Sequence, residues 1–230
     1  ALAGAIADPR RLGALPIIRE PREYVIDDSH VLLPSPRPET VVVIRGPNIK
    51  PLPLRGPLED NLRGRVLIVV GDNISTDHIM PAGAKVLPLR SNIPAISEHV
   101  FEQVDPAFAA RAKEWGGGFI AGGSNYGQGS SREHAALAPM YLGVKMVVAR
   151  SFARIHFANL INFGILPLAF LREENYRTAR MGDEWEVANV RASLKGGRPL
   201  VLHNLTQGVE IPLSYQFALR QIEVLLAGGL

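Results

Sequence analysis

The sequence predicts an α/β fold, in which a mostly parallel sheet is flanked by helices and preceded by an irregular N-terminal linker. Three observations support this prediction. Short apolar runs of strand length alternate with helical patterns between residues 63 and 170. Glycine-rich turns separate several of these segments. Proline recurs through residues 16–57, where it restrains the backbone to extended and irregular conformations.

The first 62 residues are predicted to form a separate part of the chain. Residues 1–7 are typical of the end of a helix, which the following Asp8 and Pro9 would stop. Within the proline-rich stretch, residues 41–44 allow one short strand. We therefore expect residues 1–62 to be the end of a preceding domain plus an interdomain linker, and residues 63–230 to be one domain.

Strand and helix patterns alternate after residue 63. Four apolar runs fit buried strands, at residues 66–70, 119–121, 144–149 and 165–170. Two helical patterns lie between them, at residues 131–138, limited by Pro139, and at residues 152–162, ended by Gly164. This spacing indicates parallel βαβ units.

The C-terminal quarter has a different pattern. Residues 184–213 are typical of short antiparallel strands, with Thr206, Gln207 and Gly208 as a turn. Residues 215–227 are predicted to form a closing helix.

Composition limits the classes of function. The 230 residues are 47% hydrophobic and 20% charged, a globular balance, and the net charge is only +3. A nucleic-acid partner is therefore not expected, and no apolar run has membrane length. The chain has no cysteine, which excludes disulfides and any thiolate-bound metal or iron–sulfur cluster within it. No pair of histidines has metal-ligand spacing, and we expect a cytoplasmic protein that binds no metal itself.

A glycine-rich loop between a predicted strand and a predicted helix carries the clearest chemical signal. It reads GGSNYGQGSSREH at residues 122–134. Its glycines let the backbone approach a ligand, and Ser130 with Glu133 fits a capping box that begins the helix. A helix N-terminus and the planar guanidinium of Arg132 both suit a carboxylate. Ser130 could then act as a base if amides and Arg132 stabilise its alkoxide, or the two serines could be helix caps only.

A second polar loop follows the first predicted strand. It spans residues 71–83 and is rich in Asp, Asn, Ser and Thr, which bond locally to the backbone. Within it, Asp77 and His78 are typical of a polar network, which by itself is more often structural than catalytic.

Together, DNISTDHIMPAG (residues 72–83) and NYGQGSSREHAALAP (residues 125–139) resemble the C-terminal swivelling domain of the aconitase family. The segments ARSFARIH, at residues 149–156, and GILPL, at residues 164–168, also match that domain. The resemblance implies a swivelling β/β/α domain over about residues 63–230.

The resemblance also implies roles for individual residues. Ser130 matches the family's catalytic base, and Ser131 and Arg132 match its substrate-carboxylate ligands. Arg90 looks like the arginine that grips the distal carboxylate of citrate and isocitrate. The neighbouring Gly129 would support the serine.

Two further features of the resemblance concern the surroundings of the serine. Asp77 and His78 match a loop beside the site, where Asp77 would orient an arginine or the serine. Gln128 is a departure, because many aconitases carry Glu there, and it could alter the local charge.

The implied reaction is the reversible dehydration and rehydration of citrate through cis-aconitate to isocitrate, a hydro-lyase step of the tricarboxylic acid cycle. The implied cofactor is a [4Fe-4S] cluster that acts as a Lewis acid. Because this chain lacks cysteine, other domains must hold the cluster. The expected partners are therefore cluster-bearing N-terminal aconitase domains, in the same polypeptide or in a separate subunit.

Two alternatives remain open. The small subunit of 3-isopropylmalate dehydratase, or of homoaconitase, shares the serine–arginine loop, although Arg90 favours aconitase. A non-catalytic RNA-binding module is the second alternative, for which the net charge of +3 offers little support.

Overall fold

The computed structural model describes residues 4, 6–11, 13–14 and 17–230, which divide into two units, Ala1–Ile44 and Arg45–Leu230. The described part of the first unit contains two 3-10 turns, η1 (Pro9–Arg11) and η2 (Pro38–Thr40). Residues 41–44 are irregular, so the short strand expected there does not form. The helix end expected at residues 1–7 lies mostly outside the described residues.

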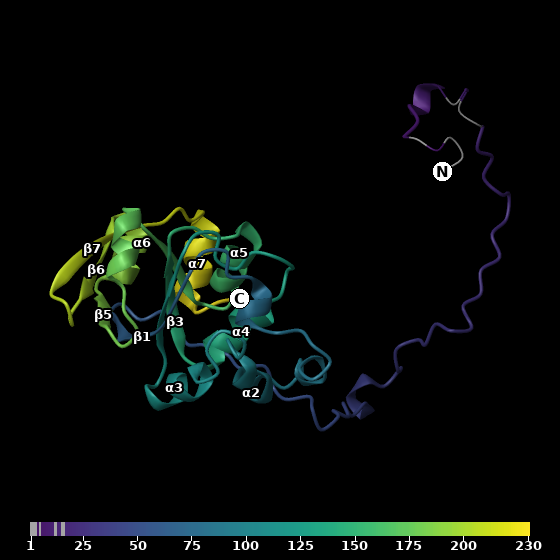
Figure 1. Cartoon of the computed structure of the whole chain (residues 1–230). Coiled ribbons are helices and arrows are strands. Elements are labelled where there is room, and N and C mark those ends of the chain that lie inside the picture. Colours follow the sequence, from purple (N-terminus) through teal and green to yellow (C-terminus); the bar gives the residue numbers. More distant parts are fainter. Residues whose placement is uncertain (1–3, 5, 12, 15–16) are drawn as a thin grey trace. The chain divides into compact units, whose positions relative to one another are not determined.

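The second unit contains a mixed sheet and its covering helices (Figure 1). The strands are β1 (Leu62–Val70), β2 (Gly118–Gly122), β3 (Val144–Ala149), β4 (Leu166–Phe170), β5 (Glu184–Val187), β6 (Leu200–Asn204) and β7 (Val209–Ser214). The α-helices are α1 (Thr76–Ile79), α2 (Ile93–Ile96), α3 (Phe108–Glu114), α4 (His134–Tyr141), α5 (Arg154–Asn162), α6 (Val190–Gly196) and α7 (Leu219–Ala227). The 3-10 turns of this unit are η3 (Leu87–Leu89), η4 (Ser97–His99) and η5 (Glu173–Thr178).

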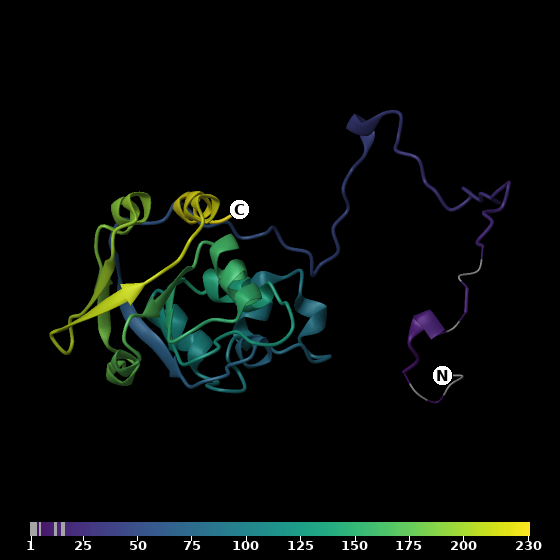
Figure 2. The same ribbon diagram turned by 90° about the horizontal axis from the view of Figure 1, so that it is seen from above.

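The sheet closes into a seven-stranded barrel with the order β1-β2-β3-β4-β7-β6-β5. Strands β1 to β4 pair in parallel in chain order, as the βαβ pattern predicts. The other three strands pair antiparallel, with β5 on β1 and β7 on β4. Figures 1 and 2 show β5–β7 on one side of the unit and α4 and α5 on the other.

The predicted mostly parallel sheet flanked by helices is therefore wrong. An open parallel sheet would leave the backbone groups of β1 and β4 unpaired at its edges. The predicted antiparallel strands of residues 184–213 instead pair with both edges, and residues 205–208 form the expected turn. Burial in β5 and β6 alternates, because only one face of each strand points into the barrel. Between these strands, α6 forms where the sequence predicted no helix.

Two apolar clusters hold the unit together. The first fills the barrel with side chains from all seven strands, including Val66, Phe119, Met146, Leu168, Trp185, Leu202 and Leu213. The second packs the outer face of β1–β3 against helices, and it includes Ile68, Ile120 and Val147 with Ile96, Phe108 and Ala138. Strands β2 and β3 are therefore buried on both faces, which matches their continuous apolar sequence.

The segment before β1 is attached to this unit. Leu58 is 2% exposed and belongs to the barrel cluster. The Arg55 guanidinium donates a 2.8 Å hydrogen bond to the Val144 carbonyl, and burial lowers the pKa of Arg55. Glu59 forms an ion pair with Lys145. The predicted domain boundary at residue 62 stays a prediction.

Among the residues that the structure describes, no helix combines the length and apolar character needed to cross a membrane.

Candidate functional site

Two loops meet beyond the C-terminal ends of the parallel strands, where α/β sheets commonly bind ligands. Residues 71–79 follow β1 and residues 123–133 follow β2. The Thr76 backbone N–H donates to the Gln128 carbonyl at 2.9 Å, and its hydroxyl donates to the Ser130 carbonyl at 2.9 Å. Because Thr76 is 2% exposed, these bonds are protected from water, and the two loops form one hydrogen-bonded unit.

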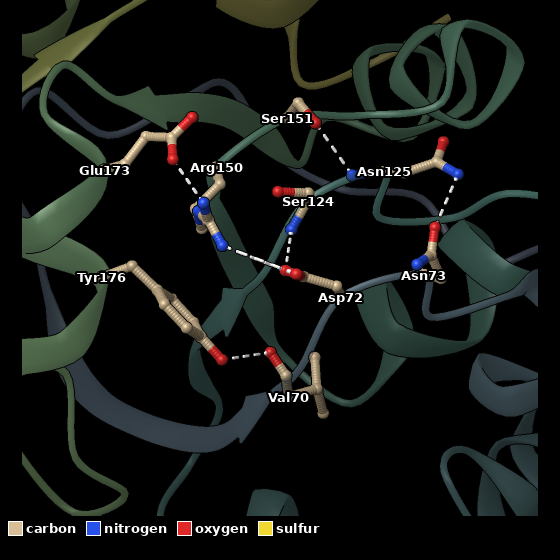
Figure 3. Close-up of polar contacts among 9 residues, drawn as sticks. All are labelled: Val70, Asp72, Asn73, Ser124, Asn125, Arg150, Ser151, Glu173 and Tyr176. Carbon is tan, nitrogen blue, oxygen red and sulfur yellow. Dashed lines mark hydrogen bonds and ion pairs between the residues drawn. The ribbon is translucent and has the colours of Figure 1, made fainter.

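Ionic contacts join the ends of four parallel strands (Figure 3). We call Asp72, Ser124, Arg150 and Glu173 the Asp72–Arg150 cluster. The Asp72 carboxylate accepts from the Ser124 backbone N–H at 2.6 Å and from the Arg150 guanidinium at 3.4 Å. Arg150 also pairs with Glu173, and this hydrogen bond raises the pKa of Arg150. The cluster therefore links the segments that follow β1, β2, β3 and β4.

Neutral contacts in Figure 3 strengthen the same edge. The Asn125 backbone N–H donates to the Ser151 hydroxyl at 2.8 Å, and its side-chain amide donates to Asn73 at 3.1 Å. The Tyr176 hydroxyl donates to the Val70 carbonyl at 2.8 Å, and burial raises the pKa of this tyrosine. Hydrogen bonds from several elements therefore hold the loops at the ends of the strands.

The segment that carries Ser130 precedes helix α4 and does not cap it. Helix α4 begins at His134, with Glu133 at the N-cap position and no side-chain cap hydrogen bond. The predicted capping box and the helix start at Ser131 are therefore wrong. The reason is tertiary, because the hydrogen bond from Thr76 holds the Ser130 carbonyl in the loop. Both serines are exposed.

An ion pair between Asp77 and Arg132 connects the two loops next to the serines. The carboxylate side chain is 57% exposed and the guanidinium side chain 23%, so solvent screens the pair in part. His78 acts within its own loop: its ring accepts from the Ser75 N–H at 3.0 Å, while the Ser75 hydroxyl accepts from the His78 N–H at 3.2 Å. This reciprocal pair caps helix α1 and so fixes the turn that carries Asp77.

Arg90 lies apart from this ion pair. It follows η3 and lines a different cavity, of about 430 Å³, together with residues such as Asn48 and Leu87. The Arg90 carbonyl lies 2.8 Å from His134 Nε2, which connects it to the start of α4. The structure therefore links Arg90 to the serine loop through His134 but does not place it in the same cavity.

A cavity of about 210 Å³ lies beside the serines. Its lining residues are Thr76, Gly127, Gly129, Ser130, Ser131, Arg132, Ala153, Arg154, Ile155, His156 and Asn159. The lining includes two arginines and three residues that carry a hydroxyl group, and none of these lining residues is acidic. The arrangement suits a small anion such as a carboxylate.

Glycine is required at the point where the loop meets helix α5. Gly127 has a φ of +80°, and a Cβ there would lie 2.1 Å from Cδ2 of His156. Gly129, with a φ of +105°, lets the backbone turn into Ser130 without steric strain. These two glycines allow the serine loop to lie directly on the helix.

Four polar lining residues were not among the predicted site residues: Thr76, Arg154, His156 and Asn159. His156 and Asn159 are three residues apart on α5, a spacing that puts them on one helix face beside the buried Leu160. Two polar residues on the apolar face of the predicted helix are a pattern in the sequence that could have identified them as candidate site residues. Burial lowers the pKa of His156 to about 4, so its ring is neutral at physiological pH.

The residues present do not fit a metal cluster. The chain has no cysteine, and the described residues include no group of three or more His, Asp or Glu that could hold a metal ion.

Comparison with known proteins identifies similar sequences and similar solved structures. The model of the aconitase C-terminal domain family matches residues 97–173. A 3-isopropylmalate dehydratase small subunit of Archaeoglobus fulgidus is 45% identical over 141 residues, which cover 61% of this chain and 76% of that protein. A probable mitochondrial aconitate hydratase of Caenorhabditis elegans is 36% identical over 190 residues, covering 72% of this chain and 24% of that protein. A solved 3-isopropylmalate dehydratase chain from Methanocaldococcus jannaschii is 31% identical with a TM-score of 0.61, covering 74% of this chain and 90% of that one.

Proposed function

The chain belongs to the aconitase family, and from this premise we propose that it is the substrate-binding small part of a hydro-lyase of the 3-isopropylmalate dehydratase type. The reaction class is the reversible removal and addition of water on a hydroxy acid that carries two or more carboxylates. The cavity beside Ser130, with two arginines, three hydroxyl groups and no acidic lining residue, is the observation that carries the proposal.

Each side chain of the site has a proposed task. Arg132, oriented by Asp77, would bind one substrate carboxylate together with the Ser131 hydroxyl. Ser130 would accept the proton from carbon, because its exposed hydroxyl faces the cavity beside a guanidinium that stabilises an alkoxide. Gly129 and His78 would support this arrangement through the loop turn and the cap of α1.

Arg90 would bind a second carboxylate from its separate cavity. Because the two cavities have no lining residue in common, a substrate that reaches both would lie across the surface of this chain. The contact between His134 and the Arg90 carbonyl would couple the two positions.

The remaining chemistry belongs to a partner. Members of this family use a [4Fe-4S] cluster, and a chain without cysteine cannot bind one through thiolates. The partner would therefore be a cluster-bearing large subunit, or cluster-bearing N-terminal domains. Residues 1–62 would include the end of a preceding domain and the linker to the substrate-binding domain.

The comparisons favour 3-isopropylmalate dehydratase over the aconitate hydratase that the sequence motifs suggested. The Archaeoglobus small subunit is 45% identical, whereas the Caenorhabditis aconitate hydratase is 36% identical. The motifs at residues 72–83 and 125–139 resemble the family as a whole, so they indicate the reaction class more firmly than the substrate.

Aconitate hydratase remains the second candidate for a specific reason. Arg90 is exposed, and its guanidinium can form an ion pair with a carboxylate, which an apolar substituent cannot do. An arginine suits the additional carboxylate of citrate or isocitrate. The residues around Arg90 would therefore determine which of the two substrates the enzyme prefers.

The first test measures turnover after the chain is combined with the cluster-bearing part of the enzyme. The substrates are 3-isopropylmalate, citrate and isocitrate, and formation of the unsaturated acid is followed by ultraviolet absorbance. We expect turnover of 3-isopropylmalate. Turnover of citrate and isocitrate alone would transfer the assignment to aconitate hydratase, and turnover of none would reject the hydro-lyase proposal.

The second test addresses Ser130. The Ser130→Ala variant should lower kcat by about 100-fold or more, because general-base catalysis commonly contributes that much. Substrate binding should persist, since Ser131 and Arg132 remain. Ser29→Ala, at an exposed serine of the first unit, is the control and should leave turnover unchanged. Normal turnover in Ser130→Ala would leave this serine with a structural role only.

A further inference from the structure

Two residues that line the cavity beside Ser130 carry buried side-chain nitrogens with no hydrogen-bond partner among the described residues. They are His156, whose two ring nitrogens are both unpaired, and Asn159, whose Nδ2 is unpaired. His156 is 1% exposed and Asn159 is 8% exposed. Both line the cavity. We call these two residues the polar floor.

Unpaired polar atoms in the polar floor are unfavourable for folding. A buried donor or acceptor that loses water and finds no partner destabilises the native state, and nearly all such groups bond to protein, ordered water or ligand. Leucine at either position would avoid this loss. The floor is therefore explained by a group that enters the cavity.

The charges around the cavity indicate what that group is. Arg132 and Arg154 supply positive charge, and the lining includes no acidic side chain. The Asn159 Nδ2 is a donor, and a neutral imidazole presents one N–H donor. Hydrogen-bond donors that share a cavity with two arginines match the oxygens of a carboxylate.

We propose that His156 and Asn159 donate hydrogen bonds to one carboxylate of the bound substrate and so fix its depth beneath Ser130. This inference rests on the proposed hydro-lyase function and adds two positioning residues to it. The ring of His156 contacts Gly127, three residues before the serine, so the same side chain would also position the serine loop. Because burial holds the pKa of His156 near 4, the floor keeps its neutral donors through the physiological pH range.

The test uses the chain combined with its cluster-bearing partner. The variants are His156→Leu, Asn159→Leu and the conservative His156→Gln, which retains a donor. The measurements are KM, kcat and Tm, and calorimetric Kd values for citrate and 3-isopropylmalate. Asn162→Leu is the matched control, because it makes the same substitution on α5 at a residue that does not line the cavity.

We expect both leucine variants to raise KM and Kd about tenfold, as the loss of a hydrogen bond to a charged group does. Their Tm should be equal or higher, because an unpaired buried polar group is removed. His156→Gln should restore part of the affinity, and Asn162→Leu should leave KM unchanged. Weaker binding with undiminished stability is a result that a purely structural role would not produce.

The contrary outcomes separate the two proposals. Leucine variants with unchanged KM and Kd would reject the proposed role of the polar floor in substrate binding, whatever their Tm. The proposed hydro-lyase function would not be affected by that result. A wild-type complex that binds citrate or 3-isopropylmalate without turnover would overturn the function. The proposed binding role of the polar floor would still be supported if the leucine variants weakened the binding of citrate or 3-isopropylmalate.

Discussion

At the scale of single residues, the site depends on how closely the serine loop approaches helix α5. Gly127 has a φ of +80° and leaves no room for a Cβ, because the His156 ring occupies that position. Nearby, Asp77 pairs with Arg132 at a partly exposed position. The first contact is steric and the second electrostatic, so they should respond differently to substitution.

Gly127→Ala should lower the free energy of unfolding by about 2 kcal/mol or more, because the left-handed backbone and the contact with His156 both oppose a methyl group. Turnover should fall as the serine loop is displaced. Gly208→Ala is the matched control: its φ is +67°, but a Cβ there meets nothing within 4 Å. Chemical denaturation of both variants measures the difference, and equal losses would mean that the contact with His156 contributes nothing.

Asp77→Asn should change stability by less than about 1 kcal/mol, because a partly exposed ion pair contributes little to folding. It should nevertheless raise KM, since Arg132 loses the partner that orients its guanidinium toward the cavity. Steady-state kinetics on the assembled enzyme and a thermal melt test the two statements separately. A lower Tm at unchanged KM would assign this pair to stability alone.

At the scale of elements, the loops after β1 and β2 act as one unit. Thr76 bonds to the segment at Gln128 and Ser130, and the Asp72–Arg150 cluster joins the ends of four parallel strands. Helices α1 and α4 start from these loops, so their positions depend on contacts between distant residues. The geometry of the candidate site is therefore set by contacts among several strand ends.

Asp72→Ala should loosen the loop at residues 123–130, because the Ser124 N–H loses its acceptor and Arg150 keeps only Glu173 as an ionic partner. Hydrogen exchange of that loop should quicken, and kcat/KM should fall. Asp72→Asn keeps an oxygen for the Ser124 N–H and should have the smaller effect. Unchanged exchange in the alanine variant would show that the other contacts of the loop, such as those of Thr76 and Asn125, hold it without Asp72.

At the scale of the whole molecule, one barrel joins residues that are far apart in the chain. Pairing of β4 with β7 and of β1 with β5 closes the sheet, and the apolar interior takes side chains from all seven strands. Because helix α5 packs against this barrel, the burial of His156 depends on the folded state. Its titration therefore reports on folding.

Stability should rise with pH between about 4 and 6.5. Burial lowers the pKa of His156 to about 4, so the unfolded chain binds more protons in this window than the folded protein does. The contribution of His156 to the free energy of unfolding is fully present above pH 6.5 and is lost as the pH falls toward 4. Its size is about 3 kcal/mol. Urea unfolding at several pH values measures it. His156→Leu should remove this contribution, and an unchanged pH dependence in that variant would assign it to other groups.

The sequence alone determined several of the local elements and the family to which the chain belongs. The strand predicted at residues 144–149 forms with those bounds, and the predicted parallel order of β1–β4 is confirmed. Strand-length apolar runs and glycine turns encode these features through neighbouring residues. The motifs around Asp77 and Ser130 likewise identified the family, because they are contiguous in the chain.

Only the tertiary structure decided how the barrel closes, where α4 begins, and which residues share a cavity. Closure depends on pairing between β4 and β7, which no local pattern specifies. The start of α4 depends on Thr76, 54 residues before Ser130, and not on a local cap. Arg90 is separated from the serine cavity, whereas His156 and Asn159 join it, because packing between distant elements determines which side chains meet.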